Sequence, residues 1–471
     1  MTPQGLPESK ELRVYDSIMG AIGNTPLVRL SKLAKQLPVP LYAKVEFINP
    51  GGSVKDRIGV TIIDSAEQQG LLKPGGTVVE ATSGNTGVGL AIVCAIRGYK
   101  SVFVMPDKMS QEKIQLLRAF GAKVVITPTA VAPEDPRSYY RVAERLAKET
   151  PNAILANQYH NPDNPRSHYE TTGPEIWEQT GGKVTDVIIG MGTGGTYSGV
   201  GKYLKEQNPK VRIVGVDVEG SILKEIWENH GQIPEGVEAI TYKVEGIGED
   251  FLPSTSDLSQ LDAIVRVNDK ESFTWARRLV AEEGIFAGGS AGSALAGAMR
   301  YCAGLEAGSL AVVLLPDSGS RYLSKFFDDK WMRENGFLES EWSEASLREA
   351  LAAKNISQLI AASAQDTISA VVAQMKEYGI SQLPVLNAEE DVAGLVREGD
   401  LLTFLLDGKN ERPGEQPIES LLQPAPPSLS AEMVLGDAMS ELLTHGAILV
   451  TDGGKPIGIL TKIDVLDFIQ R

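Results

Sequence analysis

Up to about residue 330, short runs of β-branched residues alternate with helical patterns, and this alternation limits the folds open to the chain more than any other feature. A strand that is followed by a helix and then by another strand favours a parallel sheet covered by helices. The expected strands are residues 41–47, 77–81, 101–106, 123–128, 186–192, 212–218 and 310–317. We therefore predict an α/β fold with a largely parallel sheet for this part of the chain.

Composition and charge exclude several classes of protein. The net charge of −16 argues against nucleic-acid binding, because phosphate contacts require clusters of Lys and Arg. Cys94 and Cys302 are far apart and form no CxxC pair, so we expect neither a disulfide framework nor a metal site. The longest apolar stretch, residues 88–96, is too short to cross a bilayer, and the N-terminus lacks the apolar run of a signal peptide. We expect a cytoplasmic protein that binds neither nucleic acid nor a membrane.

The length of 471 residues is enough for about two to four domains, and the last part of the chain repeats itself. Residues 394–405 and 458–469 share a glycine, an apolar strand, an aspartate and a helix start at matching offsets. Upstream, residues 375–386 and 439–450 each combine a helical stretch with a short strand. Two such copies favour a paired regulatory module, although a Gly–apolar–Asp pattern also arises by chance. The charged, helical segment before the repeat resembles a connector, so the predicted domain limits are 1–340, a linker at 341–355, and 356–471.

The stretch "NPGGSVKDRIG" (49–59) places a lysine at the mouth of a predicted helix. The apolar residues have the spacing of one buried helix face: Val54, Ile58, Ile62 and Ala66. Ser53 or the glycines would cap this helix, so Lys55 lies in the first turn, where the helix dipole disfavours a cation. A lysine there loses its proton more easily, and a neutral amine is the nucleophile that forms imines. Considered alone, a single lysine is more often a solvated surface residue.

Two further loops follow apolar strands and precede helical patterns. In "EATSGNTGVGLA" (80–91), small polar side chains alternate with glycines, and backbone N–H groups at a helix start bind anions such as a carboxylate. The polar residues of this loop are Thr82, Ser83, Asn85 and Thr86. In "IIGMGTGGTYSG" (188–199), a phosphate cradle is formed by Gly192, Thr193, Gly194, Gly195 and Thr196. An ordinary strand–turn–helix junction also explains the first loop.

The second of these loops also matches a different motif. Gly190, Gly192 and Gly195 fit G-x-G-x-x-G, and Asp217 ends the next strand, as in dinucleotide-binding enzymes. A nicotinamide-dependent dehydrogenase is therefore an alternative. The fingerprint alone is weak, and it leaves Lys55 without a role.

A fourth stretch, "AGGSAGSALAGA" (287–298), contains glycines that permit a close approach and Ser290, which offers a hydroxyl group. A helix face of small residues explains the same pattern. One cofactor would bring these stretches together, because pyridoxal 5′-phosphate has an aldehyde for Lys55, a phosphate for residues 192–196 and a ring nitrogen for Ser290, and the loop at 80–91 could hold a carboxylate beside it.

These motifs resemble the fold type II pyridoxal-phosphate family of β-replacement enzymes, whose fold is tryptophan synthase β-like, and within it the cystathionine β-synthases. The matching stretches follow the order of the family over about residues 20–330, and together they are highly specific. They are "GNTPLVRL" (23–30), 49–59, 80–91, "MPDKMSQEK" (105–113), "NQYHNPDNPRSHYETTGPEI" (157–176), "GMGTGGT" (190–196), "VDVEGSIL" (216–223), "VEGIGEDF" (244–251) and "AGGSAGS" (287–293). The C-terminal repeat is similar to a tandem pair of CBS domains (a Bateman module), so the resemblance covers the whole architecture.

The resemblance implies a role for each stretch. Lys55 forms an imine with the cofactor, Asn85 binds the ring hydroxyl group and Ser290 faces the ring nitrogen. The cofactor phosphate is held by Gly192, Thr193, Gly194, Gly195 and Thr196. The α-carboxylate of the substrate is bound by Thr82, Ser83, Thr86 and Gln158.

The implied activity is that of a lyase in transsulfuration and cysteine biosynthesis. A serine partner does not keep the pyridine nitrogen protonated, so the ring is a weaker electron sink and suits elimination at Cβ. L-Serine and L-homocysteine would condense to L-cystathionine and water, while Lys55 removes the Cα proton and protonates the departing hydroxyl group. Release of hydrogen sulfide from cysteine is expected as a side activity.

Three alternatives remain open. A cysteine synthase would use O-acetylserine and sulfide on the same scaffold, but residues 216–223 and Glu245 resemble the cystathionine enzyme, and cysteine synthases generally lack the C-terminal module. A threonine or serine dehydratase matches these motifs less well. A catalytically inactive sensor is disfavoured because Lys55 and the phosphate loop are retained.

The resemblance to CBS domains implies an adenosyl site in which an aspartate binds the ribose hydroxyl groups. The second copy supplies Thr461 and Asp464, whereas the first has Arg397 in place of the threonine and keeps Asp400. We expect at most one good site, at Thr461 and Asp464, with S-adenosylmethionine as the usual allosteric ligand of the family. A purely structural or dimerising pair is the alternative.

Two features depart from the family pattern. The residues before Gly23 contain neither Cys nor His, so we expect no haem, unlike in the animal enzymes. Glu249 stands where some relatives carry an aromatic side chain, which leaves the nearby substrate contacts open. The family forms dimers and paired CBS domains associate, so a homodimer or larger homo-oligomer is expected.

Overall fold

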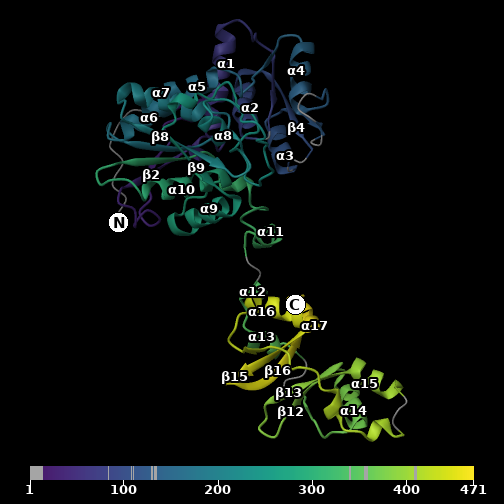
Figure 1. The fold of residues 1–471 in the computed structure, drawn as a ribbon. Helices are drawn as coiled ribbons and strands as arrows, with labels where there is room; N and C mark the ends of the chain where they lie inside the picture. Colours follow the sequence, from purple (N-terminus) through teal and green to yellow (C-terminus); the bar gives the residue numbers. More distant parts are fainter. Residues whose placement is uncertain are drawn as a thin grey trace. The chain divides into compact units, whose positions relative to one another are not determined.

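The computed structural model describes residues 14–82, 84–107, 109, 111–128, 131, 135–338, 341–354, 359–407 and 411–470. The chain divides into two compact units (Figure 1), of which the first ends at Phe337 and the second begins at Leu338. Each unit has buried apolar clusters of its own. The domain limits at residues 340 and 355 stay a prediction.

The larger sheet of the first unit has six strands in the order β1-β2-β10-β7-β8-β9. They are β1 (Leu27–Arg29), β2 (Leu41–Val45), β7 (Asp186–Gly190), β8 (Arg212–Val218), β9 (Ala263–Val267) and β10 (Ala311–Leu315). β1 is antiparallel to β2, and the other neighbouring strands are parallel. Figure 1 shows α7 (Gly195–Gln207) on one face of the sheet and α10 (Gly289–Cys302) on the other, so the apolar strands are covered on both sides.

The smaller sheet has four parallel strands in the order β5-β4-β3-β6. They are β3 (Thr77–Ala81), β4 (Lys100–Pro106), β5 (Lys123–Thr127) and β6 (Ala153–Leu155). Successive side chains of β3 point to opposite faces. Val78 lies in the cluster formed with helices α1 (Lys55–Gln68) and α2 (Asn85–Arg97), whereas Val79 packs with α4 (Tyr139–Glu149).

All seven strands expected from the sequence are present, and the α/β fold is confirmed. The strands form two sheets rather than one, and β1, β6 and β9 were not expected. β1 and β6 have three residues each, which is too short to produce a recognisable alternation. The remaining helices of this unit are α3 (Gln111–Ala119), α5 (Asp163–Glu170), α6 (Thr172–Gln179), α8 (Leu223–Glu228), α9 (Asp269–Glu283) and α11 (Asp329–Glu334).

Helices α1 and α2 pack closely because glycines meet at their contact. A Cβ atom added to Gly89 would lie 2.4 Å from the backbone oxygen of Lys55, and one added to Gly59 would lie 2.6 Å from the backbone of Gly89. The helix face expected from the sequence is buried as predicted: Val54, Ile58, Ile62 and Ala66. The close approach of the two helices at Gly59 and Gly89 holds the start of α1, and with it Lys55, against the start of α2.

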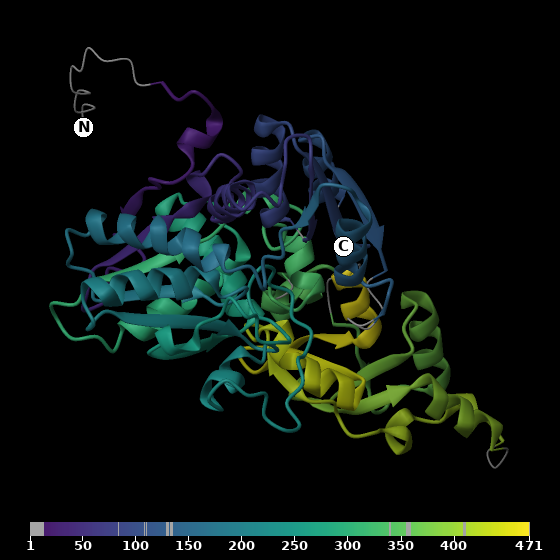
Figure 2. The same ribbon diagram turned by 90° about the horizontal axis from the view of Figure 1, so that it is seen from above.

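The second unit confirms the repeat, because each copy has the same order of a short strand, a helix, two strands and a helix (Figures 1 and 2). The first copy comprises β11 (Ala362–Ser363), α14 (Ile368–Tyr378), β12 (Gln382–Leu386), β13 (Val392–Arg397) and α15 (Glu398–Leu406). The second comprises β14 (Ser428–Ser430), α16 (Leu435–His445), β15 (Ala447–Asp452), β16 (Lys455–Thr461) and α17 (Lys462–Ile469). In both copies the first two strands are parallel and the last two antiparallel.

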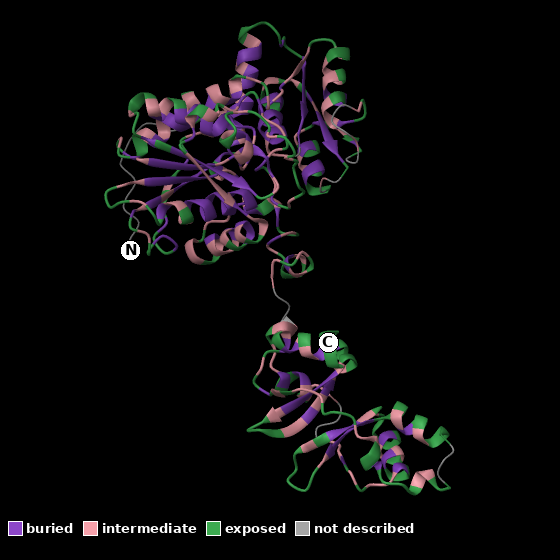
Figure 3. Cartoon of the chain, in the orientation of Figure 1, coloured by how far each residue is buried: buried purple, intermediate pink, exposed green. Residues whose placement is uncertain are grey.

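The segment before the repeat is helical, as expected, and its helices are α12 (Glu341–Glu344) and α13 (Leu347–Ala352). Leu347 and Ala350 are buried in the core of the second copy, so α13 packs with the module. Buried residues follow the strands and the inward helix faces of each unit (Figure 3). Within the described ranges, no helix has the length and apolar character needed to cross a membrane.

Candidate active site

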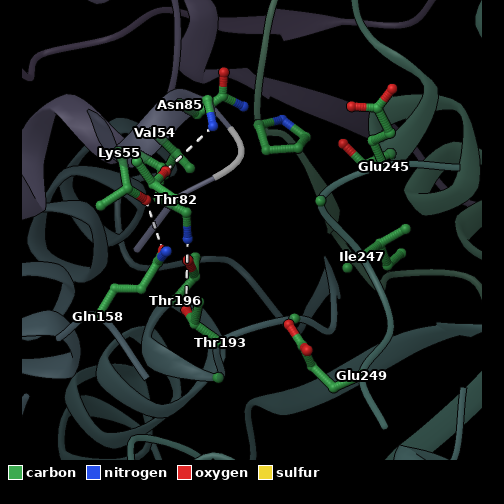
Figure 4. Close-up of a pocket in the computed structure, with 18 of the residues that line it drawn as sticks. Val54, Lys55, Thr82, Asn85, Gln158, Thr193, Thr196, Glu245, Ile247 and Glu249 are labelled. Atoms are coloured by element: carbon green, nitrogen blue, oxygen red, sulfur yellow. Dashed lines mark hydrogen bonds between the residues drawn. The ribbon is translucent and has the colours of Figure 1, made fainter. Parts of the chain in front are cut away.

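The first unit contains a pocket lined by residues from all four stretches singled out in the sequence (Figure 4). The predicted residues that line it are Lys55, Thr82, Asn85, Thr86, Gln158, Gly192, Thr193, Gly194, Thr196 and Ser290. Gly195 begins α7 beside them, and Ser83 lies outside the described residues. Most of these residues come from loops that follow the carboxyl ends of strands, where ligands bind in parallel α/β sheets.

Lys55 is the first residue of α1, and its side chain enters the pocket. The Nζ atom donates to the Thr193 hydroxyl group at 3.5 Å. Burial lowers the pKa of the amine to about 8, although the carboxyl groups of Glu249 and Asp317 oppose this shift. The helix has no side-chain cap, contrary to expectation, but the Ser53 hydroxyl group accepts from the backbone N–H of Lys55 at 3.2 Å. Little free energy is needed to remove the proton from an amine with this pKa, so Lys55 can act as a neutral nucleophile or base.

The loop before α2 is arranged to hold an anion. The backbone N–H of Gly84 donates to the Thr82 hydroxyl group at 3.2 Å, and the Thr86 hydroxyl group donates to Gln158 Oε1 at 2.6 Å. Gly84 precedes α2 with a φ of 157°, and no side chain caps the helix. N–H groups at the start of α2 are therefore left for a ligand, and a carboxylate is the partner they favour.

The loop before α7 is a second anion site. Gly194 has a φ of 87° and precedes a helix without a side-chain cap. A Cβ atom at Gly194 would lie 2.0 Å from Ser256 Oγ, and one at Gly195 would lie 1.9 Å from Asn164 Oδ1. The backbone conformation and these neighbours require glycine, and the N–H groups of the first turn, which no side chain caps, suit a phosphate.

Two residues that sequence reasoning missed hold the threonines of this loop. Asn164 Nδ2 donates to the Thr193 hydroxyl group at 3.1 Å. His168 Nε2 lies 3.3 Å from the Thr196 hydroxyl group, and its Nδ1 lies 2.9 Å from that of Thr172. Burial, with a smaller contribution from the charge of Lys55, keeps the pKa of His168 well below its usual value, so the ring is neutral. Both residues lie in the stretch 157–176, in which Gln158 is the only predicted site residue.

The Asn85 side chain is oriented by a buried acid that was also missed. Asn85 Nδ2 donates to Asp317 Oδ2 at 2.9 Å, and the Tyr322 hydroxyl group donates to the same oxygen at 2.7 Å. Burial raises the pKa of Asp317. Ser290 is the second residue of α10, is buried and lines the pocket nearby.

Residues 244–249, which we call the facing segment, lie across the pocket from Lys55 (Figure 4), and four of them line it: Glu245, Gly246, Ile247 and Glu249. Glu245 forms ion pairs with Lys113 and with Lys325. Burial alone would raise the pKa of Glu245, but the two lysines outweigh it and the pKa is lowered. This double ion pair joins the facing segment to α3 of the smaller sheet and to the end of the first unit.

The dinucleotide reading is not supported by the geometry. Asp217, whose carboxylate would bind a ribose in that reading, is fully buried in β8. Its carboxylate pairs with Arg266 at 3.2 Å and accepts from the backbone N–H of Lys224 at 2.9 Å. A buried carboxylate with these partners has no free face for a ribose.

The residues around the pocket fit pyridoxal 5′-phosphate. The lysine amine has a lowered pKa, two uncapped helix starts offer N–H groups to anions, and Ser290 supplies a hydroxyl group. Gly194 lines the pocket with Gly192 and Thr193, so the backbone of the second anion site can reach a phosphate bound there.

The predicted regulatory residues lie in the second unit. Asp464 Oδ2 accepts from the backbone N–H of Thr461 at 2.7 Å and from its hydroxyl group at 2.6 Å, which caps α17. Lys354 Nζ pairs with the same oxygen at 2.9 Å. The carboxylate expected to bind a ribose is therefore already engaged within the unit.

Comparison with known proteins agrees with this geometry. Residues 18–317 match the family model described as "Pyridoxal-phosphate dependent enzyme", and residues 353–407 and 418–471 match that of the CBS domain. The chain is 43% identical to the cystathionine beta-synthase of Mus musculus over 417 residues, which cover 87% of this chain and 72% of the mouse protein. It is 39% identical to that of Dictyostelium discoideum over 471 residues, 97% of this chain and 93% of the relative.

A solved structure is also similar to the first unit. The crystal structure of an O-acetylserine dependent cystathionine beta-synthase from Helicobacter pylori matches with a TM-score of 0.60 and 37% identity. The match covers 67% of this chain and 99% of the Helicobacter chain. All four stretches that line the pocket lie within residues 18–317, the range of the first family model.

Proposed function

The chain belongs to the family of pyridoxal-phosphate dependent enzymes and carries two CBS domains, and on this basis we propose that it is a cystathionine β-synthase. The proposed reaction condenses L-serine with L-homocysteine to L-cystathionine and water. The observation that carries the proposal is the Lys55 amine, which shares one pocket with two uncapped helix starts suited to a phosphate and a carboxylate. The match over almost the full length of the Dictyostelium relative supports the substrate assignment.

When bound, pyridoxal phosphate supplies an aldehyde for Lys55 and a ring that withdraws electrons from the substrate. We assign the phosphate to Gly192, Thr193, Gly194, Gly195 and Thr196. The side chain of Asn85, positioned by Asp317, binds the ring hydroxyl group, and Ser290 faces the ring nitrogen. The α-carboxylate of serine binds at the start of α2, to Thr82, Ser83, Thr86 and Gln158.

Lys55 acts as the base and the acid of the reaction in this proposal. Its amine takes the Cα proton of serine and delivers a proton to the hydroxyl group that leaves as water. A pKa of about 8 suits both tasks near neutral pH. The less populated protonation state of the amine costs only about 1.4 kcal/mol for each pH unit between the pH and the pKa. Thr193, at 3.5 Å from Nζ, holds the amine beside the anion sites.

The first substrate has an alternative. The Helicobacter structure is titled as an O-acetylserine dependent enzyme and resembles the first unit, so O-acetylserine is the competing donor. With cysteine as the first substrate, the same chemistry would release hydrogen sulfide. A cysteine synthase stays the second candidate function, but it does not account for the match to cystathionine β-synthases through the CBS repeat.

A product assay on the purified enzyme tests the proposal. Serine with homocysteine is compared with O-acetylserine with sulfide, and the products are identified by mass spectrometry. Cystathionine as the main product supports the assignment. Cysteine formed only from O-acetylserine and sulfide would instead identify a cysteine synthase.

We also propose that the second unit binds an adenosyl ligand, with S-adenosylmethionine as the first compound to test. Asp464 would bind the ribose hydroxyl groups beside Thr461, and the ligand would have to displace Lys354 from the carboxylate. An Asp464→Ala variant should lose this binding in calorimetry. Unchanged affinity in that variant would exclude the site.

We propose a homodimer or larger homo-oligomer, because the paired CBS domains leave apolar side chains of α15 and α17 exposed. Leu402, Leu406, Ile463 and Leu466 are among them. Light scattering on the full chain tests the assembly, and a strictly monomeric mass would contradict it. We also propose that the protein is located in the cytoplasm.

A further inference from the structure

Glu249 is the residue at which the sequence departs from some relatives, and its side chain lines the same pocket as Lys55. Figure 4 shows the carboxyl group extending from the facing segment into the pocket. The backbone of this residue is fixed, because its N–H donates to the Ser221 hydroxyl group at 3.1 Å and its oxygen accepts from the N–H of Ile222 at 3.1 Å. The backbone that carries the carboxyl group is thus fixed on the wall across from Lys55.

This carboxyl group lacks a cationic partner of its own. In the described part of the chain, no lysine or arginine forms an ion pair with Glu249, whereas Glu245 on the same segment has two. The neighbouring Tyr159 hydroxyl group and the charge of the Lys55 amine both oppose the rise in the pKa of Glu249. Glu249 is half-buried, so its carboxylate loses part of its hydration, and no paired cation offsets this cost. Burial accordingly raises the pKa of Glu249 to about 8.

The second substrate of the proposed reaction carries the missing cation. Homocysteine brings a thiol, a carboxylate and an ammonium group, whereas sulfide brings none of the charged groups. The first substrate is already held by its carboxylate at the start of α2, on the other side of the pocket from the facing segment. A carboxylate on the facing segment is therefore available to the molecule that arrives second.

We propose that Glu249 binds the α-ammonium group of the incoming thiol substrate and so selects an amino thiol over sulfide. This inference rests on the proposed function for the identity of the second substrate. The ammonium group supplies the counter-charge that the Glu249 carboxyl group lacks and thereby favours its ionised form, and hydrogen bonds between charged groups are the strong ones in such sites. Glu249 is a specificity-determining residue that contacts the substrate away from the reacting atoms.

The test removes the charge on each side of the contact. The Glu249→Gln variant keeps the shape of the side chain, and 4-mercaptobutanoate is homocysteine without its amino group. With saturating serine, KM is measured for both thiols in the wild-type enzyme and in the variant, with mass spectrometry to identify the thioether products. Calorimetric binding of the two thiols to the resting holoenzyme gives a second readout that does not depend on turnover.

We expect Glu249→Gln to raise KM for homocysteine by about 10- to 100-fold, the range for a hydrogen bond to a charged group, with kcat changed much less. KM for 4-mercaptobutanoate and KM for serine should stay within about twofold of their wild-type values, because neither compound uses the contact that the variant removes. Asp250→Asn is the control, since this neighbouring acid is exposed and does not line the pocket. Its charge helps to raise the pKa of Glu249, so its removal favours the ionised form of Glu249 and should not raise KM for homocysteine.

Three results would overturn the inference. The wild-type enzyme could bind both thiols equally well, the variant could retain the preference for homocysteine, or Asp250→Asn could reproduce the effect. If the wild-type enzyme forms no thioether from any pair of substrates, the proposed function fails instead. The calorimetric comparison of the two thiols still decides the role of Glu249 in that case.

Discussion

The sequence identifies Lys55, but the structure changes the reason for its reactivity. The helix dipole was expected to disfavour the ammonium form, whereas in the structure burial is the largest cause of the lowered pKa. Burial could not be predicted for Lys55 because it depends on the facing segment, which is about 190 residues away in sequence and closes the other side of the pocket. The same burial acts in the opposite direction on Glu249, whose pKa is raised.

Glu249 gives a prediction on stability against pH. Its pKa is about 8 in the folded chain and 4.5 in its ordinary state, so the folded protein holds this proton more tightly. The stability that results is fully present below pH 4.5 and is lost as the pH rises to about 8. A glutamine does not ionise, so Glu249→Gln should be more stable than the wild-type protein at pH 8, by more than about 1 kcal/mol.

Urea unfolding of both proteins without cofactor, at pH 5 and at pH 8, measures this difference. The gap in unfolding free energy between variant and wild type should widen from the lower to the higher pH. A gap of equal size at both values would mean that the Glu249 carboxyl group is not buried as described.

At the scale of elements, much of the fold follows from local pattern. The alternation of apolar strands and helices predicts seven strands correctly, and the internal repeat predicts the second unit. The division into two sheets does not follow from it, because strand order is set by long-range pairing such as that of β10 with β2. A related reason explains why three site residues were missed: Asn164, His168 and Asp317. Each acts through a contact with a predicted residue, and only the folded chain brings the two residues together.

The contact between α1 and α2 gives a prediction at this scale. Alanine normally stabilises a helix relative to glycine, but a Cβ atom at Gly89 would lie 2.4 Å from the Lys55 backbone oxygen. Gly89→Ala should therefore cost about 1–3 kcal/mol of stability and weaken cofactor binding by displacing the start of α1. Thermal unfolding and titration with pyridoxal phosphate measure both effects.

Gly399 in α15 offers the matched control, because no atom lies within 4 Å of the position of its missing Cβ. Gly399→Ala should be neutral or stabilising by up to about 1 kcal/mol. If the two substitutions behave alike, the close contact at Gly89 does not position Lys55.

At the scale of the whole molecule, the chain combines two units that each have their own core. The apolar clusters of the first unit contain only residues before 338, and those of the second unit begin at Trp342. The pocket residues also lie within the first unit. The catalytic proposal therefore does not require the CBS module, whereas the adenosyl proposal does.

A chain that ends after residue 338 tests this separation. It should fold, bind pyridoxal phosphate and form cystathionine, but its rate should no longer respond to S-adenosylmethionine. Circular dichroism measures folding and absorbance measures cofactor binding. The product assay, with and without S-adenosylmethionine, measures activity and its response. An aggregated or cofactor-free product would show that the first unit depends on the second.

Chemical trapping shows which lysine binds the cofactor, and we propose that this lysine is Lys55. The purified holoenzyme is reduced with borohydride, which makes a lysine–pyridoxal bond permanent, and is then digested and analysed by mass spectrometry. We predict the pyridoxyl phosphate mass on the peptide that contains Lys55, and no such adduct in Lys55→Ala. An adduct on a different lysine of the wild-type protein, or none at all, would contradict the account.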